Sequence, residues 1–182
     1  DEASTGDTVL VEGGSYSGTV DVTTSDLTIV AANPPNSSDA ATVSGASNGF
    51  DIEATGVTVK GFEVMADVGV DGSNARGIDV LASGATVESN WVHDVRAEER
   101  PIGIHVWGKG QDVSNTKVVN NRIEDVEATT LTPNLEDSDR EISKAKGIAV
   151  SGGDSANADN VEISHNTVED IGNKDTALAS AI

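Results

Sequence analysis

The sequence predicts an all-β solenoid, in which the chain coils and each coil packs on the one before it. Four units open with a glycine followed by alternating apolar positions: Gly49–Ile52, Gly77–Val80, Gly103–Val106 and Gly147–Val150. Three units continue with a phrase of the form apolar-x-x-Asn-x-apolar, and an Asp–apolar pair follows it. Self-similarity at a short period indicates that a unit cannot bury its apolar face alone and must stack on its neighbour.

Alternation within the units identifies the strands. Apolar residues recur at every second position, as at Ile104 and Val106, which is the period of a β-strand. The connecting segments are rich in Gly, Asn, Asp and Ser, and they carry no helical pattern. Parallel strands can stack without crossover helices if the chain coils, with each coil about 4.8 Å above the last. The inward side chains then form two columns: Ile78, Ile104 and Ile148, and Val80, Val106 and Val150.

The units assemble into one expected domain that spans residues 1–182. Residues 1–48 supply the N-terminal coils and residues 49–182 the regular repeats, with about five to six coils in all. The interval before the last unit is longer than the others, and we assign the surplus to an inserted loop over 127–146. The segment Thr176–Ile182 resembles the opening of another coil, so we expect the chain to be part of a longer protein.

The asparagine of the second phrase predicts a ladder of stacked side-chain amides. Asn90, Asn121 and Asn166 occupy the same position in three coils, at a bend between strands. Stacked amides at a bend satisfy one another and the turn backbone. Phe62 takes this position in the preceding unit, so we expect the ladder to begin one coil later.

These segments resemble a known fold family. Thr8–Val11, followed by a Gly-x-Tyr sequence at Gly14–Tyr16, resembles the first coil of the pectate-lyase-like superfamily, and Leu27–Val30 and Val57–Phe62 resemble its continuation. The resemblance covers nearly the whole chain and implies a right-handed parallel β-helix. It implies no single activity, because lyases, epimerases, adhesins, phage spikes and inert stalks share such repeats.

Composition restricts the compartment and the partners. The chain has 31 acidic and 11 basic residues, a net charge of −20, which argues against nucleic acid and anionic membranes as partners. Acids spread through every segment resemble the proteins of extreme halophiles, because molar salt shortens the Debye length to about 3 Å. Cysteine is absent, so disulfides and thiolate metal sites are excluded. We expect a secreted, cell-surface or virion-surface protein of a high-salt environment, with no membrane insertion.

Outward side chains on the central coils form a candidate carbohydrate-binding site. If Ile104 points inward, His105 and Trp107 point outward, and Asp79 and Asp51 share the outward column of His105. Asp79 then lies one rung from His105, about 5 Å away between backbones. Trp107 offers a flat apolar surface for a sugar ring, with charged groups beside it for hydroxyls or a uronate.

The same cluster can be interpreted as the catalytic site of a polysaccharide lyase or epimerase. His105, oriented by Asp79, would abstract the proton α to a uronate carboxylate. Arg76, Arg100 or a cation would stabilise that carboxylate. Lyases and epimerases of the resembled family use this kind of chemistry, but no motif here matches one of their signatures. The simplest alternative to both interpretations is that these surface side chains have no special role and that Trp107 packs under the insertion.

A second outward face carries Trp91 beside Arg122, which indicates a structural cation–π contact. Asp94, Asp125 and Asp170 recur beside it, and carboxylates one rung apart repel by about 1 kcal/mol even in water. Either each aspartate caps its own turn, or calcium lies between them. The sequence indicates no required cofactor, and calcium is the metal that these aspartates could bind.

Taken together, the sequence predicts an extracellular or cell-surface scaffold. It would bind polysaccharide or assemble with like subunits through its coil ends, because uncovered solenoid ends expose strand edges. The alternative is a polysaccharide lyase or epimerase that acts on uronate-containing glycans.

Overall fold

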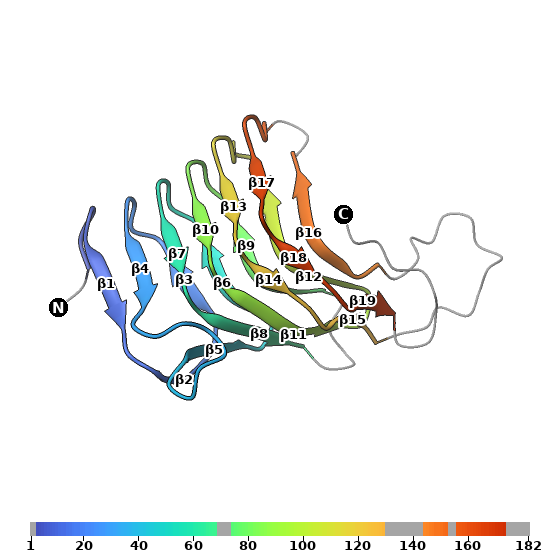
Figure 1. Cartoon of the computed structure of the whole chain (residues 1–182). Helices are drawn as coiled ribbons and strands as arrows, with labels where there is room; N and C mark the ends of the chain where they lie inside the picture. The colour runs from blue at the N-terminus through green and yellow to red at the C-terminus, as the bar shows by residue number, and fades with distance from the viewer. Residues whose placement is uncertain (1–2, 69–73, 130–143, 153–155, 174–182) are drawn as a thin grey trace.

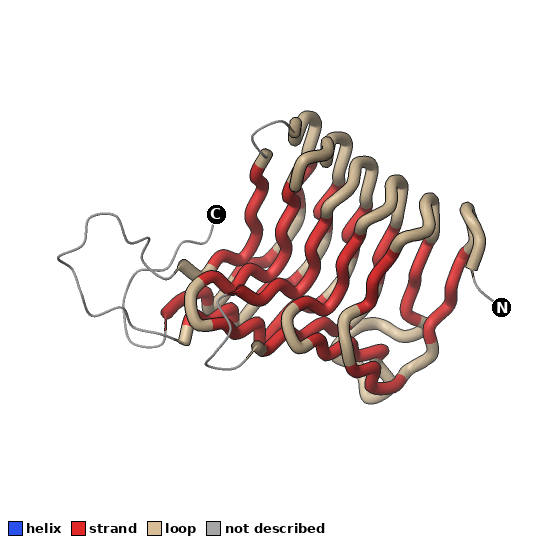
Figure 2. The backbone as a smooth tube through the Cα atoms, turned by 180° about the vertical axis from the view of Figure 1, so that it is seen from behind, coloured by secondary structure: helices blue, strands red, loops and turns tan. Residues whose placement is uncertain are grey.

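A computed structural model describes residues 3–68, 74–129, 144–152 and 156–173. This part of the chain forms strands and turns without a helix, and its strands pair in parallel within three stacked sheets (Figure 1). Viewed from behind, the coils follow one another in parallel rows joined by short turns (Figure 2). The predicted all-β parallel β-helix is confirmed.

Each coil contributes strands to the three sheets in turn. Sheet A contains β1 (Thr8–Val11), β4 (Thr28–Ala31), β7 (Thr58–Lys60), β10 (Thr86–Glu88), β13 (Lys117–Val119) and β17 (Glu162–Ser164). Sheet B contains β2 (Gly14–Ser17), β5 (Ala41–Gly45), β8 (Glu63–Asp67), β11 (Trp91–Ala97), β14 (Arg122–Ile123), β15 (Val126–Ala128), β18 (Thr167–Val168) and β19 (Ile171–Asn173). Sheet C contains β3 (Val20–Val22), β6 (Asn48–Ile52), β9 (Asn74–Val80), β12 (Arg100–Trp107) and β16 (Lys146–Ser151).

The core runs along the axis between the sheets. Ile104 pairs in register with Ile78 on one side and Ile148 on the other, as the repeat predicts. Ile78 and Ile104 are fully buried, because a complete coil covers them from each side. Val150, in the last strand of sheet C, is 39 % exposed, so the core is less completely covered at this end.

An asparagine ladder joins sheets A and B. The backbone N–H groups of Phe62, Asn90 and Asn121 donate to the Oδ1 atoms of Asn90, Asn121 and Asn166, at 3.0, 2.9 and 2.9 Å. Each Nδ2 group donates to a carbonyl of the preceding coil, that of Val59, Val87 or Val118. Asn90 and Asn121 are almost completely buried, so the ladder supplies hydrogen bonds that water cannot reach.

The recurring aspartates of sheet B have a backbone explanation. Asp94, Asp125 and Asp170 each adopt a left-handed conformation with φ near 50°. The pairing between β8 and β11 shifts at this point, between Val92 and Val95, which is the signature of a β-bulge. Asp tolerates this backbone conformation better than most residues. In these three coils the recurring Asp therefore occupies a backbone position that favours it at a bend.

The expected insertion is shorter at both ends than the sequence indicated. Val126–Ala128 form β15, and Lys146 begins β16, so both ends of the assigned 127–146 segment belong to the sheets. Residues 130–143 lie outside the described residues, as does the Thr176–Ile182 segment that resembles a further coil.

Candidate functional site

A row of polar side chains crosses the outer face of sheet C. Asp21, Asp51, Asp79 and His105 are paired in register on β3, β6, β9 and β12. Their neighbours along each strand point into the core, so alternation directs these four side chains outward. The row is a line of three carboxylates that ends at an imidazole.

His105 is surrounded by protein groups. Its Nδ1 atom lies 3.0 Å from Nε of Arg76 and 3.1 Å from Oδ1 of Asp79, and its Nε2 atom lies 3.2 Å from Oγ of Ser151. Arg76 also approaches Oδ2 of Asp79 at 3.4 Å. Although it lies on the outer face of the sheet, His105 is only 7 % exposed, and Asp79 is 4 % exposed. Both ring nitrogens are thus occupied within the protein.

The glycine that opens each unit explains how Arg76 reaches this cluster. A Cβ on Gly77 would lie 2.6 Å from the carbonyl oxygen of Gly103 and 2.3 Å from Val92, so only glycine fits between the coils. In each unit, the residue before the glycine faces outward, and it lies beside the outward residue that comes two places after the glycine. Arg76 therefore contacts Asp79, and one coil earlier Asn48 donates a 2.7 Å hydrogen bond to Asp51.

Trp107 stands at the edge of the cluster. Its ring stacks beside His105 with centroids 5.5 Å apart, and the cationic groups of Arg76 and Lys109 lie 5.7 and 5.6 Å from its centroid. Trp107 is half-buried, whereas Lys109 is exposed. Within the described residues, the indole N–H of Trp107 makes no hydrogen bond, unlike that of Trp91.

Arg100 stands apart from the cluster. It is the first residue of β12, five residues before His105, which corresponds to about 16 Å along an extended strand. Of the two arginines that the sequence suggested, the structure brings only Arg76 to Asp79 and His105. The sequence did not identify Asn48 and Ser151 as members of this row of contacts. Asn48 could have been found, because it stands directly before a repeated glycine, as Arg76 does.

Asp51 lies in an environment that disfavours its charged form. Burial raises the pKa of its carboxyl, and the neighbouring carboxylates of Asp79, Asp21 and Glu53 raise it further. The hydrogen bond from Asn48 opposes this shift without reversing it. The coils on the N-terminal side of the cluster therefore carry an excess of negative charge on the outer face of sheet C.

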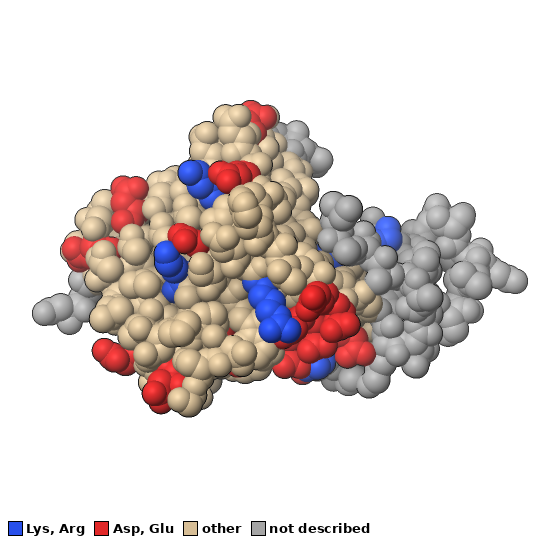
Figure 3. Space-filling view, viewed as in Figure 1, with Lys and Arg blue, Asp and Glu red and all other residues tan. Residues whose placement is uncertain are grey.

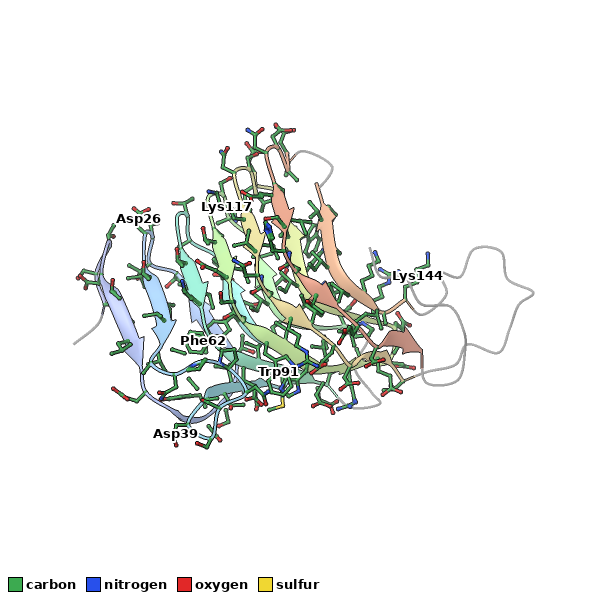
Figure 4. All side chains as sticks on the ribbon, viewed as in Figure 1. Asp26, Asp39, Phe62, Trp91, Lys117 and Lys144 are labelled. Atoms are coloured by element: carbon green, nitrogen blue, oxygen red, sulfur yellow. The ribbon has the colours of Figure 1, made fainter. Side chains whose placement is uncertain are left out.

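Sheet B carries a second cluster, around Trp91 and His93. The two rings stack with centroids 4.0 Å apart, and the indole N–H of Trp91 donates to Glu124 at 2.5 Å. Arg122 binds Glu124 at 2.6 Å and lies 5.8 Å from the Trp91 centroid, which is the cation–π contact the sequence indicated. In the space-filling view, basic and acidic side chains meet in this region (Figure 3), and Figure 4 labels Trp91 on the same sheet.

His93 bridges two carboxylates in this second cluster. Its Nδ1 atom lies 2.8 Å from Asp94, and its Nε2 atom lies 3.0 Å from Glu63. Burial raises the pKa of the Asp94 carboxyl, but the hydrogen bonds to His93 and Arg96 outweigh burial and hold this pKa below its usual range. The carboxylate of Asp94 is thus engaged by side chains rather than by its own turn.

The described residues contain no group of three or more His, Cys, Asp or Glu side chains arranged to hold a metal ion. No helix of the described ranges is long and apolar enough to cross a membrane. Comparison of the chain with protein-family models, with curated proteins and with solved structures finds no match. The function must therefore be argued from the geometry of the two outer faces.

Proposed function

We propose that this protein is an extracellular or cell-surface scaffold that binds polysaccharide through the outer face of sheet C, in a high-salt environment. Its β-helix would be of the pectate-lyase-like type, as the first coils suggest. The observation that carries the proposal is the half-buried Trp107, whose indole N–H is not used by the described protein groups. A sugar ring that packs on this indole would also find the exposed ammonium of Lys109 nearby.

The groups beneath Trp107 support a binding role. Arg76, Asp79 and His105 hold one another by contacts of 3.0 to 3.4 Å, and Arg76 and His105 lie beside the Trp107 ring. A rigid, prearranged aromatic surface loses little entropy when a ligand binds. Such a platform on a stiff solenoid suits adhesion to a polymer.

The burial of His105 argues against catalysis as the first choice. A general base must come within about 3 Å of the proton that it removes. Asp79, Arg76 and Ser151 occupy both ring nitrogens of His105, and only 7 % of this residue is exposed. A substrate would reach Trp107 and Lys109 before it reached the imidazole.

Affinity electrophoresis in molar salt tests the proposal. The gels contain polygalacturonate, alginate, xylan or galactomannan, and the variants are Trp107→Ala and, as a matched control on sheet B, Trp91→Ala. We expect at least one polymer to retard the native protein and the Trp91→Ala protein, and to bind Trp107→Ala about tenfold more weakly. Equal mobility of the native and Trp107→Ala proteins in all four gels would refute the site.

A polysaccharide lyase or epimerase acting on uronate-containing glycans is the second candidate, because the 3.1 Å contact of Asp79 with His105 resembles an oriented base. In molar salt with calcium, a lyase would produce unsaturated ends that absorb ultraviolet light. An epimerase would change the uronate composition seen by NMR. Turnover by the native protein that His105→Ala abolishes would place this activity ahead of simple binding.

End-to-end assembly of like subunits is a further candidate. Leu10 and Tyr16 of the first coil are 61 % and 41 % exposed, and Ile163 of the last described coil is 47 % exposed. Apolar side chains at strand edges favour association. Sedimentation velocity in molar salt would show a mass that grows with concentration, and Leu10→Glu would reduce that growth.

A further inference from the structure

We infer that the outer face of sheet A holds a second saccharide site, separate from the face that carries Trp107, and that it takes a neutral oligosaccharide. A hollow of about 380 Å³ lies over β10, β13 and β17. Its lining includes Thr86, Glu88, Lys117, Asn120, Glu162 and His165. The hollow opens widely to solvent, so it is a shallow groove on the surface of the sheet and not an enclosed cavity.

The repeat builds this groove from three successive coils. Thr86, Lys117 and Glu162 are paired in register and form one column across the sheet. Inward neighbours such as Val87 and Val118 are fully buried, so alternation directs the column outward. Polar groups therefore recur about every 4.8 Å along the groove.

One edge of the groove lies at the turn from sheet A to sheet B. Asn120 and His165 adopt left-handed conformations there, with φ of 58° and 59°, immediately before the ladder residues Asn121 and Asn166. Both residues line the groove. The ladder beneath them is hydrogen-bonded from coil to coil, so this edge is held rigidly.

The groove offers both kinds of hydrogen-bonding group. Glu88 accepts from Lys60 at 2.9 Å, and Glu162 accepts from Ser164 at 2.9 Å, which positions two carboxylates as acceptors. Lys117 forms no ion pair within the part of the chain that the structure describes, so its ammonium is available as a donor. Sugar hydroxyls both donate and accept, and this mixture of groups suits them.

Charge and polarity narrow the ligand class. The lining carries the carboxylates of Glu88 and Glu162 and the ammonium of Lys117, a formal charge of −1 with His165 neutral, in a protein of net charge −20. The two carboxylates would repel a phosphate or a uronate polymer. Among the lining residues only Val119 is apolar, which disfavours an apolar ligand. Lys117 is labelled in Figure 4, and in Figure 3 the charges over the upper part of this face are scattered, whereas acidic and basic side chains gather at its lower right.

A groove on sheet A would give the protein two faces for sugar. One molecule could then bridge two polysaccharide strands, a consequence that rests on the proposed function of sheet C. The groove itself does not depend on it, because the two sets of residues lie on different sheets.

Amide NMR on the full chain in molar salt tests the groove. The probes are cellotetraose, mannotetraose and chitotetraose, with trigalacturonate as the charged comparison. We expect one neutral probe to shift the amides of residues 117–120 and 162–165. Lys117→Met should weaken this binding about tenfold, because it removes a charged hydrogen-bond donor. Glu162→Gln should weaken it less, because a neutral amide oxygen replaces the charged acceptor. Thr28→Val, at an outward position of sheet A outside the groove, and Lys109→Met, beside Trp107 and outside the groove, should leave it unchanged.

The outcomes separate the two proposals. Shifts confined to the surroundings of Trp107 would overturn the groove and leave the proposed function standing. Shifts confined to the groove would support the site on sheet A and would count against the proposed site at Trp107. Stronger binding of trigalacturonate than of every neutral probe, equal binding by the Lys117→Met protein, or no groove shifts with any neutral probe would each overturn the inference.

Discussion

Two faces of this solenoid carry the same aromatic pair and use it differently. On sheet B, Trp91 stacks on His93 at 4.0 Å and gives its N–H to Glu124, which Arg122 also binds. On sheet C, Trp107 lies 5.5 Å from His105 and keeps its N–H free of the described protein groups. The comparison teaches that a tryptophan whose polar edge is already satisfied is part of the framework, whereas one with an unsatisfied edge can serve a ligand.

Removal of each indole should give the largest difference in stability between the structural role of Trp91 and the binding role of Trp107. We expect Trp91→Ala to lower the free energy of unfolding by about 3 kcal/mol, because it removes packing and leaves Glu124, 9 % exposed, without its indole donor. Trp107→Ala should cost about 1.5 kcal/mol, since only packing is lost. Urea denaturation in molar salt measures both. An equal cost for the two variants would remove the distinction.

The polar partners of Trp91 on sheet B and of His105 on sheet C provide a sharper comparison. Glu124→Ala should cost about 2 kcal/mol, because it leaves the Trp91 N–H and Arg122 without their acceptor. Ser151→Ala, which removes one neutral contact of His105, should cost about 1 kcal/mol. The same denaturation experiment applies. A larger loss for Ser151→Ala would mean that sheet C, and not sheet B, holds the stabilising network.

One aspartate on each of the two faces, Asp94 on sheet B and Asp51 on sheet C, should respond to pH with opposite sign. Asp94 has a lowered pKa in the folded protein, so its contribution, about 0.5 kcal/mol for a partly exposed ion pair, is present above the unfolded pKa near 3.9. That contribution is lost as pH falls. Asp51 has a raised pKa, so folding favours its protonated form, and this stabilisation is lost as pH rises through the folded pKa.

Asparagine substitutions isolate these two effects. The cost of Asp94→Asn should shrink as pH falls below about 4. Asp51→Asn mimics the neutral carboxyl, so relative to the native protein it should become more favourable as pH rises to 7. Unfolding free energies measured across this range check both slopes. Parallel slopes for the two variants would show that the two faces do not differ electrostatically.

The parts of this structure that follow from period alone could be predicted from the sequence. The core column of Ile78, Ile104 and Ile148 and the ladder of Asn90 and Asn121 depend only on the recurrence of one residue type at one place in each unit. Stacked parallel coils place equal positions on top of one another, so a repeated residue type identifies its own neighbours.

Properties that depend on contacts between coils could not be predicted in the same way. Alternation places His105 on the outer face, but its burial follows from the contacts of its ring with Arg76 and Ser151, and the repeat does not specify these residue types. For the recurring Asp94 the sequence left a turn cap and calcium open, and its φ of 50° at a bulge is a backbone requirement that spacing does not reveal. The sequence groups Arg100 with Arg76, because both come shortly before the outward residues of their strands. In the structure Arg100 is the first residue of β12, and the length of this strand separates it from His105.

Accessibility of a single tryptophan tests the central claim most directly. In a Trp91→Phe protein, Trp107 is the only tryptophan, and acrylamide quenching of its fluorescence reports how exposed it is. Quenching is measured in molar salt with and without polygalacturonate, alginate, xylan and galactomannan. We predict that one of these polymers protects Trp107 and shifts its emission. Unchanged quenching and emission with all four polymers would contradict the assignment of sheet C as a polysaccharide-binding face.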